Sequence, residues 1–203
     1  MDAEADAFET VRGGARIEMK VRDSRFIAVV HHVRKRDEVE VVLNALRGEF
    51  HDATHHCYAY RLGSSGEQHR AHDDGEPAGS AGKPILHAID REGLRNVLVV
   101  VIRYFGGTKL GVGGLHRAYG GAAARALASA QRETTYVMEQ MTISFAHDQM
   151  GGVMHAIAKT GARTVETTYH DQVVMRLEVR ASRAGQLRGA LADRTGGRVT
   201  FIP

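Results

Sequence analysis

Alternating and continuous apolar stretches up to about residue 130 predict a domain that mixes strands and helices. Two stretches of strand length flank the polar pair Arg22–Asp23, and a third run repeats apolar side chains at helical spacing. The polar segment 69–84, rich in glycine and charged residues, is expected to be irregular. The predicted elements are strands at 15–21, 24–33, 55–62 and 96–104 and helices at 36–50, 85–93 and 115–130.

The rest of the chain repeats strand and helix patterns in a different order. Its pattern reads strand, helix, strand, strand, helix, strand, and Ser182 is expected to cap the second helix. That βαββαβ order fits the split βαβ, ferredoxin-like motif. We therefore place a domain boundary near Arg132–Tyr136. The predicted segments are a loosely docked leader at 1–15, a first domain at 16–133 and a second domain at 134–203.

Composition narrows the class of protein. The longest strongly apolar run, Val97–Ile102, is far shorter than the roughly 20 residues that span a membrane, so we expect no membrane association. The single cysteine, Cys57, excludes an internal disulfide framework and fits a reducing cytoplasm. The acidic start of the chain lacks the pattern of an export signal. The formal net charge of +3 permits binding to nucleic acid without arguing for it.

The stretch RYFGGTKLGVGGLHRAYGG, Arg103–Gly121, is the most unusual part of the chain. It follows an apolar run and leads into an alanine-rich helix, so its backbone N–H groups and the helix dipole favour an anion. It matches neither GxxxxGK[ST] nor GxGxxG. The alternative is a loop whose glycines serve positive φ angles and close packing. The candidate anion-binding or nucleic-acid-binding residues are Arg103, Gly106, Gly107, Lys109, Gly111, Gly113, Gly114 and Arg117.

An acidic loop precedes this stretch. Asp73, Asp74 and Glu76 lie within four residues, just after His69 and His72, and oxygen ligands at this density could hold Mg²⁺. The spacing does not match an EF-hand, and the alternative is that these carboxylates are solvated or cap the following helix. No cofactor is expected from the sequence.

Two further features carry alternative interpretations. Cys57 is interpreted as a buried, inert thiol, because a nucleophilic role would need a base that the fold alone could bring near it. The arginines of the tail could form a basic face for RNA or the ribosome, or belong to an ordinary solvated surface. They are Arg176, Arg180, Arg183, Arg188, Arg194 and Arg198.

Two long motifs in order, Asp73–Pro84 and Val99–Ala122, make this chain closely resemble the YigZ/IMPACT family. The resemblance covers roughly residues 15–130. The tail resembles the smaller C-terminal domain of bacterial members, although its sequence is less distinctive. His116 departs from the pattern, because an aliphatic residue is expected there.

The resemblance implies an α+β fold, with a first domain similar to domain 2 of ribosomal protein S5. It implies a second domain similar to the ferredoxin-like C-terminal domains of translational GTPase elongation factors. The eukaryotic relatives are regulators of translation that restrain an initiation-factor kinase, but they carry a different accessory domain, so that partner does not transfer. The family offers no agreed catalytic residues, and this chain lacks the ATP loop of kinases that share the S5-like fold.

Two functional hypotheses follow. The first is a cytoplasmic, non-enzymatic, translation-associated protein that binds RNA or the ribosome through the glycine loop and the tail. The second is an enzyme or binder of a phosphorylated small ligand, with Mg²⁺ bridging, in a site between residues 73–76 and 106–114. Convergence of the two motifs in space would favour a shared site, and wide separation would exclude the second hypothesis.

Overall fold

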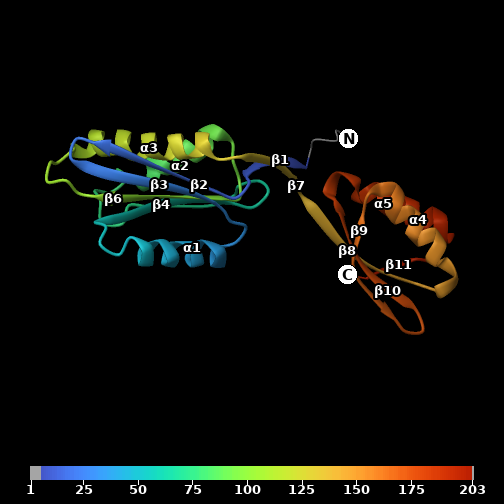
Figure 1. Cartoon of the computed structure of the whole chain (residues 1–203). Coiled ribbons are helices and arrows are strands. Elements are labelled where there is room, and N and C mark those ends of the chain that lie inside the picture. Colours follow the sequence, from blue (N-terminus) through green and yellow to red (C-terminus); the bar gives the residue numbers. More distant parts are fainter. Residues whose placement is uncertain (1–5, 203) are drawn as a thin grey trace. The chain divides into compact units, whose positions relative to one another are not determined.

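The computed structural model describes residues 6–202, which divide into two compact units (Figure 1). The N-terminal unit contains Phe8–Thr135, and the C-terminal unit contains residues 136–202 together with residues 6–7. Strands β1 (Ala7–Val11) and β7 (Arg132–Tyr136) form a two-stranded sheet. Within the described residues, no helix combines the length and the apolar character needed to cross a lipid bilayer.

The prediction of a loose leader at 1–15 is wrong for residues 7–15, and residues 1–5 lie outside the described part. β1 occupies this segment, and the next strand already starts at Gly14. Val11 is 1% exposed and packs in the main core, and Thr10 hydrogen-bonds His32. The partner strand of β1 lies more than 100 residues away in the chain, so local sequence patterns cannot reveal the pairing.

The N-terminal unit is built on a five-stranded antiparallel sheet in the order β2-β3-β6-β4-β5. Helix α1 covers one face, and α2 and α3 cover the other (Figure 1). The strands are β2 (Gly14–Val21), β3 (Ser24–His32), β4 (His55–Leu62), β5 (Gln68–His72) and β6 (Val97–Tyr104), and the helices are α1 (Arg36–Glu49), α2 (Gly82–Glu92) and α3 (Gly111–Ser129).

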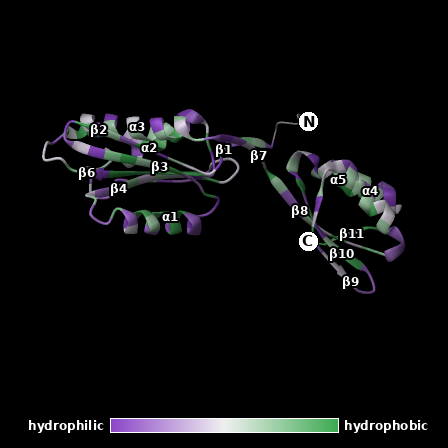
Figure 2. Ribbon diagram, in the orientation of Figure 1, coloured by the Kyte–Doolittle hydropathy of each residue, from purple (hydrophilic) through white to green (hydrophobic). Residues whose placement is uncertain are grey.

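Strand β6 is apolar along most of its length because it lies in the middle of the sheet, between two cores. Val97, Val99 and Val101 face the core under α2 and α3, while alternate residues face the core under α1. Alternation of side chains between the two faces of a strand explains this division. Figure 2 shows hydrophobic and hydrophilic residues alternating along α1, as expected for a helix with one buried face.

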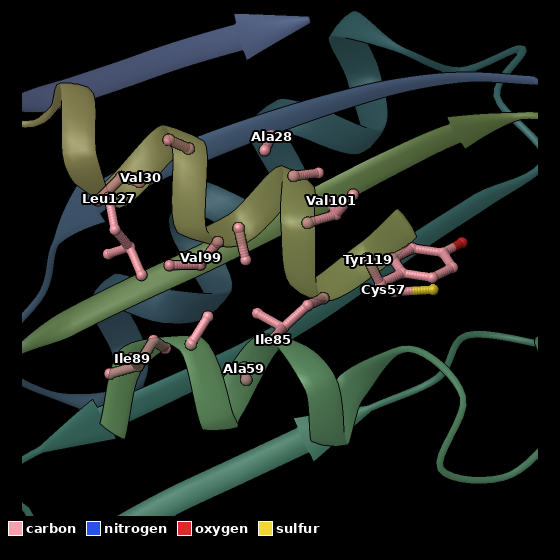
Figure 3. Packing of buried hydrophobic residues seen from close by; sticks show 14 of the residues in the cluster. Ala28, Val30, Cys57, Ala59, Ile85, Ile89, Val99, Val101, Tyr119 and Leu127 are labelled. Atoms are coloured by element: carbon pink, nitrogen blue, oxygen red, sulfur yellow. The ribbon is translucent and has the colours of Figure 1, made fainter. Parts of the chain in front are cut away.

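The alanine-rich helix α3 packs closely on the sheet. Its buried alanines are small enough to let the helix approach strands β2, β3 and β6, and Figure 3 shows Tyr119 and Leu127 of α3 pointing into the same core as Ile85 and Ile89 of α2. A Cβ at Gly120 would lie 3.5 Å from the Cβ of Pro84 in α2, so the two helices are in close contact there.

The C-terminal unit has the predicted βαββαβ order. Its four-stranded sheet runs β11-β8-β10-β9, and α4 and α5 cover one face (Figure 1). Its elements are β8 (Met138–Phe145), a short 3₁₀ helix η1 (His147–Gln149), α4 (Met150–Thr160), β9 (Arg163–Tyr169), β10 (Val173–Arg180), α5 (Ala181–Thr195) and β11 (Thr200–Ile202).

The first turn of α5 is capped by a residue from the other end of the chain. The Asp6 carboxylate accepts a 2.9 Å hydrogen bond from the Ser182 N–H and pairs with the Arg180 guanidinium at 2.6 Å. The prediction that the Ser182 side chain is the cap is therefore wrong, because α5 begins at Ala181, so that Ser182 lies in its first turn, and Asp6 supplies the acceptor. The N–H of Val137 donates to the Asp6 carbonyl, so Asp6 belongs structurally to the C-terminal unit.

Two boundaries in the N-terminal unit also differ from prediction. The segment 69–84 is not wholly irregular, because β5 occupies its start and pairs with β4. Helix α3 begins at Gly111 rather than Leu115, so three of the candidate glycines lie in its first turn. Glycine is a poor helix former, which is why the sequence pattern placed the start of α3 too late.

Candidate functional site

The glycine loop, residues 105–110 between β6 and α3, is held by the turn between β2 and β3. The Thr108 hydroxyl donates to the Asp23 carboxylate at 2.8 Å, and the Gly106 N–H donates to the Ser24 hydroxyl at 3.3 Å. The Arg22 guanidinium reaches the Lys109 carbonyl at 3.4 Å. Residues from a distant hairpin turn therefore fix the shape of this loop.

The glycines of this region serve different purposes. A Cβ at Gly106 would lie 2.0 Å from the Asp23 carbonyl oxygen, so only glycine fits this approach. Gly107 and Gly111 have φ angles of 90° and 70°, a region that glycine adopts without strain. A Cβ at Gly113 would meet only the Arg117 guanidinium at 3.6 Å, and one at Gly114 would approach Leu110 at 3.0 Å. Close packing and positive φ angles explain Gly106, Gly107 and Gly111 without any ligand.

Arg103 points into the protein. It is 4% exposed, its Nη1 donates to Glu76 Oε1 at 2.6 Å, and its Nη2 donates to the Ser24 hydroxyl at 3.1 Å. The prediction that Arg103 contacts an external anion is therefore wrong, because its charge is already neutralised by a buried carboxylate. Alternation along β6 turns Arg103 inward, and the sequence could not show which charge it meets there.

Glu76 joins the acidic loop to the glycine loop region. In addition to the bond from Arg103, it accepts a 2.7 Å hydrogen bond from the Tyr119 hydroxyl of α3.

Cys57 lies in the same buried region and donates to the Asp73 carbonyl at 3.0 Å. Burial raises the pKa of the Tyr119 hydroxyl and of the Cys57 thiol well above their ordinary values, so both stay protonated. The two sequence motifs therefore converge, and Cys57 is buried and protonated as expected of an inert thiol.

The three acidic side chains of the loop face separate internal partners. Asp73 accepts from the N–H groups of Gly79, Ala81 and Gly82 at 2.8, 3.0 and 2.8 Å and so caps the start of α2. Asp74 accepts from the N–H of His56 at 2.7 Å, and Glu76 is paired with Arg103. No group of three or more potential metal ligands occurs within residues 6–202. The oxygens of Asp73, Asp74 and Glu76 do not converge, so the geometry does not support a Mg²⁺ site. The alternative, that a carboxylate of this loop caps the following helix, holds for Asp73.

A pocket of about 210 Å³ lies at the start of α3. Arg22 and Arg117 line it together with Leu110 and Gly114, and no acidic side chain of the described chain lines it. Lys109 is exposed on the adjoining loop, and among residues 6–202 neither its ammonium group nor the Arg117 guanidinium forms a hydrogen bond or ion pair. The predicted residues Lys109 and Arg117 thus lie at one basic surface.

Sequence reasoning missed Arg22 as part of this surface. Arg22 has a φ angle of 50° in the tight turn between β2 and β3, and the sheet brings that turn beside the glycine loop. The polar pair Arg22–Asp23 was visible as a turn, but its proximity to residues 105–110 depends on β3 pairing with β6.

The tail arginines do not form a free basic face. Four of them pair with carboxylates, Arg183 donates to the Thr160 carbonyl, and Arg194 contacts His155. The ordinary-surface interpretation therefore describes the tail better than the RNA-binding one. The four ion pairs are Arg176–Glu166, Arg180–Asp6, Arg188–Glu139 and Arg198–Asp148.

Comparison with known proteins places these features in a family. The Impact N-terminal domain model matches residues 22–127, and a domain of unknown function, DUF1949, matches residues 143–198. The chain is 30% identical to the IMPACT family member YigZ of Escherichia coli, over 90% of this chain and 91% of that protein. It is 38% identical to an IMPACT family member of Thermus thermophilus, over 88% of this chain and 97% of that one.

Similarity extends to a eukaryotic relative and to a solved structure. The chain is 40% identical to Protein IMPACT of Oryctolagus cuniculus over 95 residues, which are 44% of this chain and 29% of that protein. A crystal structure described as that of a hypothetical protein matches with a TM-score of 0.78 and 28% identity, over 97% of both chains. The similarity covers both units and includes the two motifs that meet at Glu76 and Arg103, and the chain belongs to the IMPACT family.

Proposed function

We propose that this protein acts in translation by binding RNA or the ribosome through the basic surface formed by Arg22, Lys109 and Arg117. The observation that carries this proposal is that Arg22 and Arg117 line a pocket that no described acidic side chain lines, with Lys109 exposed on the adjoining loop. The pocket adjoins the first turn of α3, which contains no acidic residue and adds the positive end of the helix dipole. Phosphate groups complement such a surface.

We further infer that the N-terminal unit is S5 domain 2-like and that the C-terminal unit is ferredoxin-like. The strand order β11-β8-β10-β9 with a βαββαβ sequence of elements supports the second assignment. The proposed domains are 16–133 and 134–203. A free, buried cysteine supports a cytoplasmic location, where thiols remain reduced.

The proposal is tested by fractionating a cell lysate on a sucrose gradient and following the protein across the ribosome profile. Wild-type protein is expected to sediment with ribosomal particles at low salt and to be released as salt rises. The double variant Lys109→Glu/Arg117→Glu should remain at the top of the gradient.

A matched control separates the site from a general charge effect. Lys20 and Lys35 are exposed, and they lie on the α1 side of the sheet and at the start of α1. The variant Lys20→Glu/Lys35→Glu makes the same change in net charge and should sediment like the wild type. Wild-type protein that stays at the top of the gradient, and binds no RNA at low salt, would refute the proposal.

The same pocket favours one alternative function, the binding of a phosphorylated small ligand. Two arginines and the start of a helix that lacks a side-chain cap are a suitable environment for one phosphate group. A thermal-shift screen of nucleotides and sugar phosphates, with and without Mg²⁺, tests it. Stabilisation that Arg117→Glu abolishes would support this function, and the absence of any stabilisation would exclude it.

A further inference from the structure

A groove of about 360 Å³ runs between α2 and α3 on the outer side of the N-terminal unit. Ile85 and Ile89 of α2 point into the core (Figure 3), whereas His87 and Arg91 lie on the exposed side of the same helix. His116 and Arg117 are exposed on α3 and line the groove from the other side. The remaining lining is mostly small, contributed by Pro84, Ala88, Gly120, Gly121 and Ala124.

Two arginines and two histidines line the groove, and their side chains are available. Within the described residues, none of His87, Arg91, His116 and Arg117 forms a hydrogen bond or ion pair. Glu92 is the acidic residue that lines the groove, and it is already paired with Arg132. An anion that enters the groove therefore meets two guanidinium groups and two imidazoles with no free opposing carboxylate.

The groove shares a lining residue with the basic surface at the glycine loop. Arg117 lines both the groove and the 210 Å³ pocket that contains Arg22. A chain of phosphate groups could therefore pass from Arg22 over Arg117 to Arg91 without leaving a cationic environment.

We propose that this groove binds a single-stranded segment of RNA, an inference that rests on the proposed function and names its ligand. Single strands are bound by positively charged grooves that follow the backbone, and unstacked bases pack on imidazole rings and guanidinium planes. A duplex presents a wide, shallow minor groove that protruding elements contact, and a recessed groove between two helices does not complement it. The small residues at the base of the groove let a polynucleotide backbone come close.

Gly121 offers a direct test, because a Cβ there would have no other atom within 4 Å and the chain contains no tryptophan. Gly121→Trp fills the groove without straining the helix and introduces the only tryptophan of the chain, whose emission can be excited selectively. Gly48→Trp is the matched control, since Gly48 is also helical with open space around it but lies on α1. Binding is measured by fluorescence anisotropy of a labelled 12-nucleotide oligouridine at low salt.

We expect Gly121→Trp to weaken binding by about tenfold, equivalent to about 1.4 kcal/mol, and Gly48→Trp to leave it unchanged. Saturating oligouridine should quench the tryptophan introduced at position 121, and an RNA duplex of the same length should compete poorly. If Gly121→Trp binds like the wild type and its emission does not change, while Lys109→Glu/Arg117→Glu abolishes binding, the groove inference is wrong and the proposed function stands. Equal competition by the duplex also overturns the groove inference. If the wild type binds no RNA, both proposals fail.

Discussion

At the scale of single residues, the Glu76–Arg103 pair is the main electrostatic contact that the family motifs create. Both side chains are about 5% exposed or less, so neither charge is solvated by water. Burial of two charges is tolerable only when they pair closely and further hydrogen bonds support them. Tyr119 donates to Glu76 and Ser24 accepts from Arg103, whereas Arg103 Nε has no hydrogen-bond partner within residues 6–202. We interpret the pair as structural support that fixes the acidic loop against β6 and α3.

Removing one partner of this pair should therefore destabilise the N-terminal unit. Glu76→Gln is expected to lower its free energy of unfolding by about 3–5 kcal/mol, because Arg103 is left as an uncompensated buried charge. Denaturant unfolding followed by circular dichroism measures the change. The control is Glu49→Gln, which breaks the half-exposed Arg16–Glu49 pair and should leave stability nearly unchanged. Equal effects of the two substitutions would show that the buried Glu76–Arg103 pair contributes no more to stability than a half-exposed ion pair.

Asp73 makes stability depend on pH in a defined direction. Burial alone would raise the pKa of its carboxyl group, but hydrogen bonds from the N–H groups of Gly79, Gly82 and Ala81 outweigh burial and hold the pKa below its ordinary value of 3.8. A folded-state pKa below the unfolded one means that the stabilisation is present above about pH 4 and is lost as the pH falls through the lower folded value.

The prediction is that stability declines below about pH 4 and that Asp73→Asn declines less steeply there, since asparagine does not titrate. The difference is measured by thermal unfolding of both proteins at pH values from about 2.5 to about 7, a range that includes the ordinary pKa of an aspartate. At neutral pH the variant should be less stable, because an amide offers fewer acceptor sites to the start of α2. Parallel pH profiles for the two proteins would contradict the assigned capping role.

The sequence identified the region of the candidate site better than the direction of each side chain. Lys109 and Arg117 are exposed as an anion site requires, whereas Arg103 is equally basic in sequence but buried. Lys109 lies on the loop and Arg117 on the exposed side of α3, whereas Arg103 lies on the inner face of β6 and meets Glu76, a residue 27 positions earlier. Contacts between residues so far apart in the chain cannot be predicted from local sequence patterns.

At the scale of elements, the glycine loop and the start of α3 combine two kinds of glycine. Gly106 is required by close approach of the chain to Asp23, but Gly113 lies in a helix with space for a side chain. Gly106→Ala should therefore displace the β2–β3 turn and destabilise the N-terminal unit. Gly113→Ala should be neutral or stabilising by up to about 1 kcal/mol, because alanine is the better helix former.

Melting temperatures of the two alanine variants, measured under identical conditions, compare these effects. A result in which Gly113→Ala is the more damaging substitution would contradict this division of the glycines.

Most elements were predictable because their apolar periodicity is local. The other strands and helices of both units were recognised in the correct order, and the apolar run of β6 indicated a strand. The exceptions were β1, its partner β7, β5 and the first turn of α3. β1 depends on a partner far away in the chain, β5 is polar and exposed, and glycine obscures the start of α3.

At the scale of the whole molecule, the candidate binding cations of the two units differ in whether they form ion pairs with carboxylates. In the C-terminal unit, carboxylates neutralise four of the six tail arginines described above. In the N-terminal unit, none of the cations at the pocket and the groove forms an ion pair with a carboxylate within residues 6–202; they are Arg22, Arg91, Lys109 and Arg117. We therefore propose that the N-terminal unit contacts RNA, and we predict that its phosphate contacts determine the affinity.

The most direct test of that claim is the salt dependence of binding to single-stranded RNA, compared between the wild type and Lys109→Glu/Arg117→Glu. For the wild type, the logarithm of the association constant should fall linearly with the logarithm of salt concentration, with each phosphate contact contributing about 0.7 to the slope. The double variant should bind more weakly and show a shallower slope, because two contacts are lost. An affinity that does not respond to salt, or equal slopes for the two proteins, would contradict the account.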